Sequence, residues 1–245
     1  MRNFPGEFSD LLTPRGLRIL NGEDASVQAS FGGARGRFAT LRGMVPRDKA
    51  EACMGMLDRH LYEHMQDYRI SIPRESISEM ETNYSETLGK TIRFKTAFLQ
   101  RRSARSYGAV ERIGLLRMMK SESFIAFAEA VTGLRLDRRR DLQIICYGHG
   151  DYVGPHNDHH PEDETMRDGF VDFHLMFSNS AVAHQYLVYE ERGHLSKMVD
   201  VNLQGGVSIY KLPFWHYTTP LWAKPGREAS ARRWLLLGTF KIAGP

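Results

Sequence analysis

Residues 142–158, LQIICYGHGDYVGPHND, join a short apolar run to a segment rich in groups that can bind a metal or a substrate. The last twelve residues contain three glycines, two histidines and two aspartates. A short apolar run followed by turn residues is typical of a buried β-strand. We therefore expect a strand that ends near Tyr147, a glycine-rich turn, and a second strand that carries His156 and Asp158.

The rest of the C-terminal half repeats this pattern of short apolar runs followed by turn residues. Four more short runs of aliphatic and aromatic residues follow, separated by turn residues: VDFHLMF (171–177), HQYLVY (184–189), GGVSIYKL (205–212) and RWLLLGTF (233–240). No long helical stretch intervenes. This pattern predicts an all-β barrel or sandwich as the core.

The N-terminal half has a different pattern. Residues 17–44 alternate loosely between glycines and predict two or three short strands. Residues 47–68 place apolar side chains at helical spacing and predict an amphipathic helix. Residues 85–133 are mostly helical in pattern, and RLDRRRD (135–141) is expected to be a solvated connection. The clearest helix follows Ser121 or Ser123 as its cap and ends at Gly133.

Composition narrows the class of protein. The chain has 245 residues, 42% of them hydrophobic, which is enough to build a buried core in one domain. Its net charge is only +4, with acidic and basic residues mixed, so we expect no nucleic-acid partner. No apolar run is long enough to span a membrane, and the N-terminus lacks the apolar segment of a signal peptide. Cys53 and Cys146 have no CxxC partner, which favours a reduced, cytoplasmic protein over one with a disulfide.

The polar strand after the glycine-rich turn suggests a metal site. Side chains alternate along a strand, so His156 and Asp158 are expected on one face and Asn157 on the other. With a second imidazole from elsewhere they would form the 2-His-1-carboxylate arrangement, which holds Fe(II) and leaves the opposite positions open. The tripeptide His156-Asn157-Asp158 by itself fits a polar surface loop better than a metal site. The sequence around it must therefore distinguish the two.

In that context, residues 141–241 resemble the Fe(II)- and 2-oxoglutarate-dependent dioxygenases of the prolyl-hydroxylase-like group. Three pieces occur in the family's order. The first is the entry strand, the second is a distal histidine followed four residues later by a proline, and the third is an arginine that opens a late strand. They are carried here by Tyr147, Gly150, Tyr152, Pro155, His156 and Asp158, then by His216 and Pro220, then by Arg233.

The resemblance implies the fold, the cofactors and their ligands. The fold would be mainly β with flanking α, a double-stranded β-helix (a jelly-roll, cupin-like barrel) covered by N-terminal helices. One oxygenase domain would span 1–245, with N-terminal strands and support helices over 1–133 and the barrel core over 134–245. His156, Asp158 and His216 would hold Fe(II), while Arg233, Tyr147 and Thr218 would bind the cosubstrate 2-oxoglutarate, and O2 would be the oxidant.

The resemblance also implies an activity. The protein would hydroxylate an unactivated C–H bond of a small molecule, such as an amino acid or a biosynthetic intermediate, and release succinate and CO2. Thr239 stands where the nucleic-acid demethylase branch carries a second arginine, so that branch is disfavoured. Halogenation is disfavoured because Asp158 is present. A non-oxidative cupin-like protein that binds a metal or another ligand, and a peptidyl hydroxylase, remain as alternatives.

The remaining histidines receive separate interpretations. HLYEH (60–64) matches an inverted zinc-peptidase pattern, but surface neighbours on a helix explain it better. His159 and His160 are expected at a lip of the site, and His149 in a structural turn. For His174, the sequence does not decide between a substrate-facing position and the outer wall.

Overall fold

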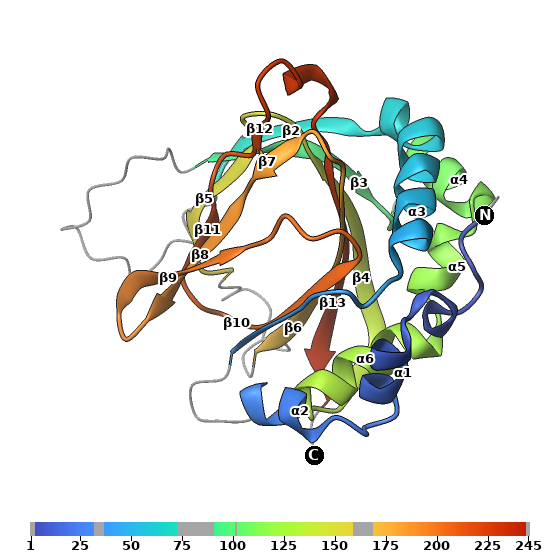
Figure 1. Ribbon diagram of the computed structural model, residues 1–245, viewed down its shortest axis with the longest axis vertical. Coiled ribbons are helices and arrows are strands. Elements are labelled where there is room, and N and C mark those ends of the chain that lie inside the picture. Colours follow the sequence, from blue (N-terminus) through green and yellow to red (C-terminus); the bar gives the residue numbers. More distant parts are fainter. Residues whose placement is uncertain (1–2, 32–36, 73–90, 101, 159–168, 244–245) are drawn as a thin grey trace.

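The structure is a computed structural model of the chain, and it describes residues 3–31, 37–72, 91–100, 102–158 and 169–243. One strongly curled antiparallel sheet forms the centre of the described structure, and the helices gather against one side of it (Figure 1). The sheet rolls into a double-stranded β-helix. The predicted fold class, mainly β with flanking α, is therefore confirmed.

Eleven strands form this sheet in the order β1-β10-β6-β13-β4-β3-β5-β11-β8-β9, and β2 pairs with β3 beside the path. Strands β7 and β12 form a separate two-stranded sheet. The strand bounds are β1 (Phe38–Leu41), β2 (Gln66–Ser71), β3 (Thr91–Phe98), β4 (Leu136–Tyr147), β5 (Tyr152–His156), β6 (Phe170–Ser178), β7 (Val182–His184), β8 (Tyr186–Glu191), β9 (His194–Asp200), β10 (Gly206–Leu212), β11 (His216–Thr218), β12 (Trp222–Ala223) and β13 (Arg233–Ile242).

Strand β13 shows how the sheet separates two cores. It pairs with β4 on one side and β6 on the other. Trp234 and Leu236 pack into the larger apolar cluster under the helices, whereas Leu235 belongs to the cluster inside the barrel. Arg233 and Leu237 lie on the inner face with Leu235, as alternation along a strand requires. The inner face of this strand therefore leads from Arg233 into the barrel.

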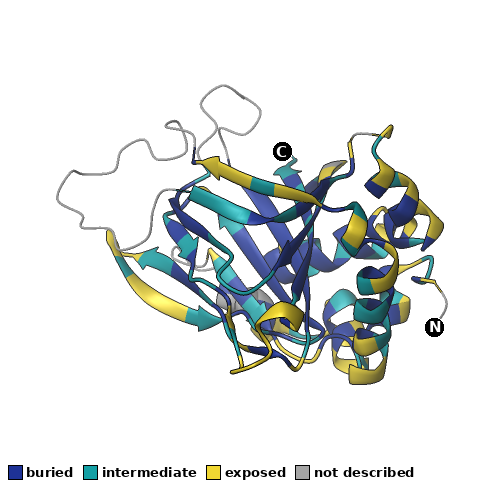
Figure 2. Ribbon diagram, turned by 90° about the horizontal axis from the view of Figure 1, so that it is seen from above, coloured by how far each residue is buried: buried dark blue, intermediate teal, exposed yellow. Residues whose placement is uncertain are grey.

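The helices cover the outer face of β4, β6 and β10. Their bounds are η1 (Phe8–Leu11), α1 (Pro14–Leu20), α2 (Ala25–Phe31), α3 (Arg47–His60), η2 (Tyr62–His64), α4 (Arg105–Arg112), α5 (Leu115–Met119), α6 (Glu122–Thr132) and, near the C-terminus, η5 (Glu228–Ser230). Phe124 and Phe127 of α6 contact Phe173 of β6 ring to ring, and each ring's burial stabilises the fold by about 1.5–3 kcal/mol. Figure 2 shows buried residues on the sheet and on the helix faces toward it.

The predicted bounds of the best helix are confirmed. Ser121 is the N-cap of α6, and Gly133 ends it in the left-handed conformation, with φ at 69°. The Ser121 hydroxyl accepts a hydrogen bond from Phe8 N at 3.2 Å and caps no N–H of its own helix. The serine therefore ties the N-terminal segment to α6.

The strands expected over 17–44 are largely wrong, because among the described residues of this region only β1 is a strand, and residues 17–20 and 25–31 are helical. The residues at the start of α1 do predict a helix, although the spacing of the glycines favoured strands. Thr13 caps the helix by accepting a hydrogen bond from Gly16 N, and Pro14 occupies the first helical turn. Both features favour a helix start.

Three other segments differ from expectation because strand pairing decided them. The helix predicted over 47–68 ends with α3 at His60, and residues 66–71 pair with β3 instead. Residues 91–98, expected to be helical, form β3, which lies between β4 and β5. The basic segment 135–141 is not a connection, since β4 begins at Leu136. Strands from the first half of the chain thus complete the sheet of the second half.

No helix of the described segments is long and apolar enough to cross a membrane. Cys53 and Cys146 are both free and buried. Burial raises the pKa of the Cys53 thiol to about 12, so it behaves as a small apolar side chain.

Gly205 fastens the sheet to the segment that precedes α3. Its N–H donates to Met176 O at 2.9 Å, and its carbonyl accepts from Met44 N at 3.0 Å and Val45 N at 2.9 Å. Its φ is 67°, and an added Cβ would lie 2.8 Å from Val45 O and 2.9 Å from Val45 Cβ. Both the backbone conformation and the space therefore require glycine.

We expect Gly205→Ala to lower the free energy of unfolding by about 2–4 kcal/mol, the sum of left-handed strain and overpacking. Gly193→Ala is the matched control, because Gly193 has φ at 81° but nothing within 4 Å of an added Cβ. It should cost only about 1–2 kcal/mol. Urea unfolding of both variants measures the difference, and equal losses would show that the contact with Val45 is unimportant.

Candidate metal centre

Two histidines from distant parts of the chain lie side by side inside the barrel. β5 and β11 pair antiparallel with His156 opposite His216, and the ring centroids are 4.3 Å apart. Both residues are buried. The strand pairing therefore brings together two imidazoles that are 60 residues apart in sequence.

Each imidazole is held in one tautomer by its own backbone. His156 Nδ1–H donates to Gly154 O at 2.8 Å, and His216 Nδ1–H donates to Phe214 O at 2.8 Å. A carbonyl can only accept, so when each ring is neutral its proton is on Nδ1 and its lone pair is on Nε2. This is the orientation that second-shell hydrogen bonds give to metal-binding histidines.

Asp158 faces both Nε2 atoms. Its Oδ1 lies 3.4 Å from His156 Nε2, and its Oδ2 lies 3.4 Å from His216 Nε2. One ligand atom from each of the three residues lies within 4.8 Å of the others, which is the geometry of a group that could hold a metal ion. Two imidazoles and one carboxylate are a donor set that suits Fe(II).

The reason expected for the meeting of His156 and Asp158 is wrong. They do not share a strand face, because β5 ends at His156. Asp158 lies beyond the strand with φ at 53°, in the left-handed region that aspartate adopts more readily than most residues. The chain turns back at this point, and the turn brings the carboxylate to the rings.

The protonation of the two histidines differs. Burial disfavours the cation of His156, but the Asp158 carboxylate outweighs it and raises the net pKa of His156 above its ordinary value. Burial and the neighbouring His156 lower the pKa of His216 to about 4. His216 is therefore neutral and ready to bind a metal at neutral pH, whereas the raised pKa of His156 means that this ring holds a proton more readily than His216 does.

The three residues line a cavity of about 170 Å³ that Arg233 also lines. The Arg233 side chain is 1% exposed; its Nε donates to Val201 O at 2.9 Å, and its Nη1 donates to Gln185 Oε1 at 2.9 Å. In the described part of the chain no carboxylate lies within 4.0 Å of this guanidinium. Burial lowers the pKa of Arg233, which shows how costly the charge is at this place.

Tyr147 and Thr218, the other two residues expected to bind the cosubstrate, line the same cavity. The Arg233 guanidinium carbon lies 5.0 Å from the Tyr147 ring centroid, and the Tyr147 hydroxyl interacts with Thr218. Thr218 Oγ1 accepts a hydrogen bond from Val153 N at 2.9 Å. The structure thus places all six predicted site residues around one cavity, while their assignment as ligands stays a prediction.

Sequence reasoning missed the residues that orient Arg233. Gln185 is fully buried, and its Nε2 donates to Thr219 O at 3.0 Å, which leaves Oε1 to accept from Arg233. Met176 Sδ lies 3.2 Å from Arg233 Nη2. A lone glutamine and a lone methionine in apolar runs carry no signal of this role, because it arises only when β6, β13 and the residue between β7 and β8 meet in the fold.

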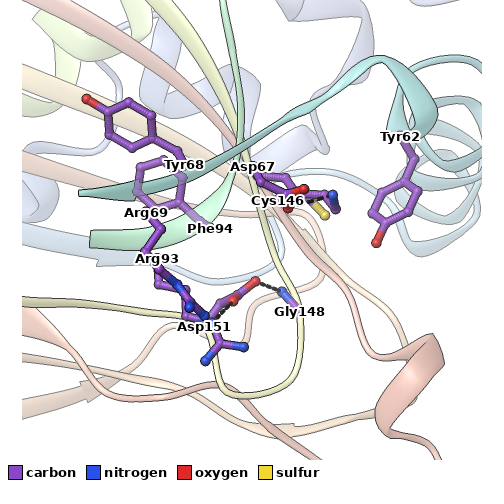
Figure 3. Close-up of a pocket in the computed structure, with 10 residues that line it drawn as sticks. Tyr62, Asp67, Tyr68, Arg69, Arg93, Phe94, Cys146, Gly148 and Asp151 are labelled. Carbon is purple, nitrogen blue, oxygen red and sulfur yellow. Dashed lines mark hydrogen bonds and ion pairs between the residues drawn. The ribbon is translucent and has the colours of Figure 1, made fainter. Parts of the chain in front are cut away.

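A second cavity, of about 380 Å³, lies on the other face of β4 and is lined by Cys146 and by charged residues of β2 and β3 (Figure 3). Four of its charged side chains are already paired. Lys95 Nζ lies 2.7 Å from Asp67 Oδ1, and Arg93 Nε lies 3.0 Å from Asp151 Oδ1. These ion pairs leave fewer charges free to hold a ligand than the size of the cavity suggests.

Asp151 in this second cavity has a structural task. Besides the ion pair with Arg93, its Oδ2 accepts from Gly148 N at 2.8 Å, as Figure 3 shows. Its backbone carbonyl accepts from Leu221 N at 2.9 Å. Asp151 thereby closes the turn between β4, which carries Tyr147, and β5, which carries His156.

The rival histidines do not form a site in the described structure. His60 ends α3, and Glu63 and His64 belong to the separate η2, so HLYEH (60–64) does not lie on one helix. His149 lies in the turn, where it accepts from Ala223 N at 3.3 Å, in agreement with a structural role. His159 and His160 lie outside the described residues.

The fold is that of the Fe(II)- and 2-oxoglutarate-dependent oxygenases, as comparison with solved structures shows. A 2OG-Fe(II) oxygenase family oxidoreductase from Burkholderia pseudomallei matches with a TM-score of 0.55 and 11% identity, over 89% of this chain and 90% of that one. A Pseudomonas putida prolyl-4-hydroxylase matches with a TM-score of 0.53 and 13% identity, over 90% of this chain and 99% of that one.

A third match is the α-ketoglutarate-dependent epimerase SnoN from nogalamycin biosynthesis, with a TM-score of 0.52 and 13% identity, over 89% of this chain and 83% of that one. At the sequence level, no protein-family model matches the chain and no curated protein matches it. The similarity therefore establishes the fold, and the chemistry must be argued from the site.

We expect Asp151→Ala to lower the free energy of unfolding by about 1–3 kcal/mol, because it leaves Gly148 N–H and Arg93 without their partner. It should also weaken metal binding, since the turn positions β5. Asp137→Ala is the control, because Asp137 makes a similar bond to a backbone N–H, from Arg139 at 2.8 Å, but on the exposed surface. Chemical unfolding and a metal titration check both effects. Equal behaviour of the two variants would contradict the assigned role.

Proposed function

We propose that this protein is an Fe(II)- and 2-oxoglutarate-dependent oxygenase that hydroxylates an unactivated C–H bond of a small molecule. One observation carries the proposal. The two histidines and the aspartate lie around the same cavity as a buried arginine that has no carboxylate partner among the described residues. The comparisons support the fold that this function requires.

The charges in the cavity fit a metal ion and a dicarboxylate. A buried guanidinium with no anion is costly, and hydrogen bonds to a carbonyl and an amide only partly offset that cost. A divalent metal adds positive charge beyond what Asp158 neutralises. 2-Oxoglutarate carries a carboxylate at each end, so one can meet Arg233 while the keto acid end meets the metal.

The protein's own residues would then have separate tasks. His156, Asp158 and His216 hold the metal through Nε2, a carboxylate oxygen and Nε2. Arg233, fixed by Gln185, presents its planar fork to the far carboxylate, a contact that arginine makes better than lysine. Tyr147 and Thr218 add hydroxyl groups beside the guanidinium.

When bound, Fe(II) and 2-oxoglutarate together supply the activation of O2, with release of succinate and CO2. The chain supplies orientation and a largely buried cavity. The modest size of that cavity, about 170 Å³, supports a small substrate or a single side chain. Peptidyl hydroxylation is the second candidate, since one protein of this fold is a prolyl-4-hydroxylase.

A non-oxidative cupin-like metal protein is a weaker candidate. Such a barrel needs the three metal ligands but has no use for a buried guanidinium. Arg233 is the observation against it, because it is buried with no carboxylate partner in the described segments, and such a guanidinium fits an anionic cosubstrate.

We expect anaerobic addition of Fe(II) and then 2-oxoglutarate to the purified protein to produce a weak visible charge-transfer band. His156→Ala should abolish the band by removing a metal ligand. His194→Ala is the control, because His194 is exposed on β9. If the wild-type protein shows no band and binds zinc instead, the cupin-like alternative gains and the oxygenase proposal fails.

We expect Arg233→Lys to weaken 2-oxoglutarate binding about 10- to 100-fold, since the paired charge-assisted hydrogen bonds are lost, while Fe(II) binding is retained. Arg232→Lys is the control. Its guanidinium carbon lies 4.0 Å from the centroid of the Tyr62 ring, and neither residue lines the cavity of the candidate metal ligands. Titration of 2-oxoglutarate against the visible band compares the two. If both variants bind the cosubstrate as wild type does, Arg233 does not contact it.

A further inference from the structure

His174, whose orientation the sequence left open, points into the cavity from β6. It is 7% exposed, and neither of its ring nitrogens makes a hydrogen bond within the described structure. Its ring meets Tyr210 edge to face at 4.4 Å. A buried imidazole with both nitrogens unsatisfied costs stability. Because this one lines the cavity of the candidate metal ligands, a bound molecule would supply the missing hydrogen bonds.

Asp172, two residues earlier on the same strand face, is the neighbour of His174. It is 9% exposed, and its Oδ1 accepts from Thr239 Oγ1 at 2.6 Å. Its Oδ2 lies 3.7 Å from His174 Nε2, beyond hydrogen-bond length. Across the described segments no lysine or arginine lies within 4.0 Å of this carboxylate. Among the described residues, the buried Asp172 carboxylate therefore has a hydroxyl on one oxygen and an imidazole 3.7 Å from the other, but no cation in contact.

The pair lies at the opposite end of the barrel wall from Arg233. In the pairing of β13 with β6, Ser178 is opposite Arg233, whereas His174 is opposite Leu237 and Asp172 opposite Thr239. Six residues of strand separate Arg233 from Thr239, which is about 20 Å. The Tyr210 ring contacts both His174 and His216, with centroid distances of 4.4 Å and 5.9 Å. The pair thus lines the same cavity as the candidate metal ligands, at the end away from Arg233.

Asp172 and His174 together would bind a positively charged ligand group that has several hydrogen-bond donors. Asp172 Oδ2 accepts hydrogen bonds, and one nitrogen of a neutral His174 accepts as well. A protonated amine offers three N–H donors and would neutralise the buried carboxylate. A carboxylate or phosphate at the same place would face the charge of Asp172.

We propose that Asp172 and His174 bind an ammonium group of the substrate, so that this protein acts on a small molecule that carries a primary amine. The inference rests on the proposed oxygenase function and makes its substrate class narrower. Thr239 is a positioning residue, because it holds Asp172 Oδ1 and turns Oδ2 toward His174.

The test is calorimetric titration of linear alkylamines and L-amino acids, each against its N-acetylated partner, which lacks the charge. The protein is loaded anaerobically with Fe(II) and 2-oxoglutarate, so that binding is measured without turnover. Wild type should bind at least one amine about tenfold or more tightly than its partner, and Asp172→Asn should remove that preference. Asp48→Asn, on the exposed surface, is the control.

His174→Phe separates recognition from a structural role. Removal of an unsatisfied buried imidazole should leave the melting temperature unchanged or raised while amine binding weakens. A structural role predicts a lower melting temperature instead, and that result would count against the proposal. The visible band with Fe(II) and 2-oxoglutarate should persist in both cavity variants.

Three results would overturn the proposal: no amine binding at millimolar concentration, a preference for uncharged or anionic members, or an amine preference that survives Asp172→Asn. The outcome is distinct from failure of the oxygenase proposal, which is a missing band in wild type. In that case the same titrations on the protein alone still decide whether Asp172 and His174 bind an amine.

Discussion

The antiparallel pairing of β5 with β11 is the interaction on which the candidate site depends. It sets His156 opposite His216, and backbone carbonyls two residues before each ring fix both Nε2 atoms toward the same space. Neither strand has more than five residues, so the turns around them carry much of the positioning. The Asp151 turn on one side and the left-handed Asp158 on the other complete the arrangement.

Because side chains alternate along each strand, the outer and inner faces of the barrel wall have different roles. On β13 the outward residues are apolar and join the helices, whereas the inward residues begin with Arg233 and continue with leucines. β6 repeats the division: Phe173 and Leu175 face the helices, and Asp172, His174 and Met176 face inward. The outer cluster stabilises the fold, and the inner face is thereby free to hold groups that are poorly satisfied.

Those poorly satisfied groups are concentrated on one strand. In the described residues the buried side-chain atoms without a hydrogen bond belong to His174 and Ser178, both on the inner face of β6. Arg233, opposite Ser178, is buried with no carboxylate within 4.0 Å among the described residues. A fold that needed only stability would replace these groups by apolar ones. The presence of His174 and Arg233 around one cavity is what a ligand with charges at two ends would explain.

The sequence by itself determined the short C-terminal strands and the helix from Ser121 to Gly133, because alternation and caps are local signals. The six candidate site residues came from the resemblance to a known family, and their roles stay a prediction. Only the tertiary structure decided that residues 91–98 and 136–141 belong to strands, since their partners lie far away in the chain. It also decided that Asp158 reaches the rings through a turn and that His174 faces inward. Register between distant strands sets which face is enclosed, and no local pattern contains that register.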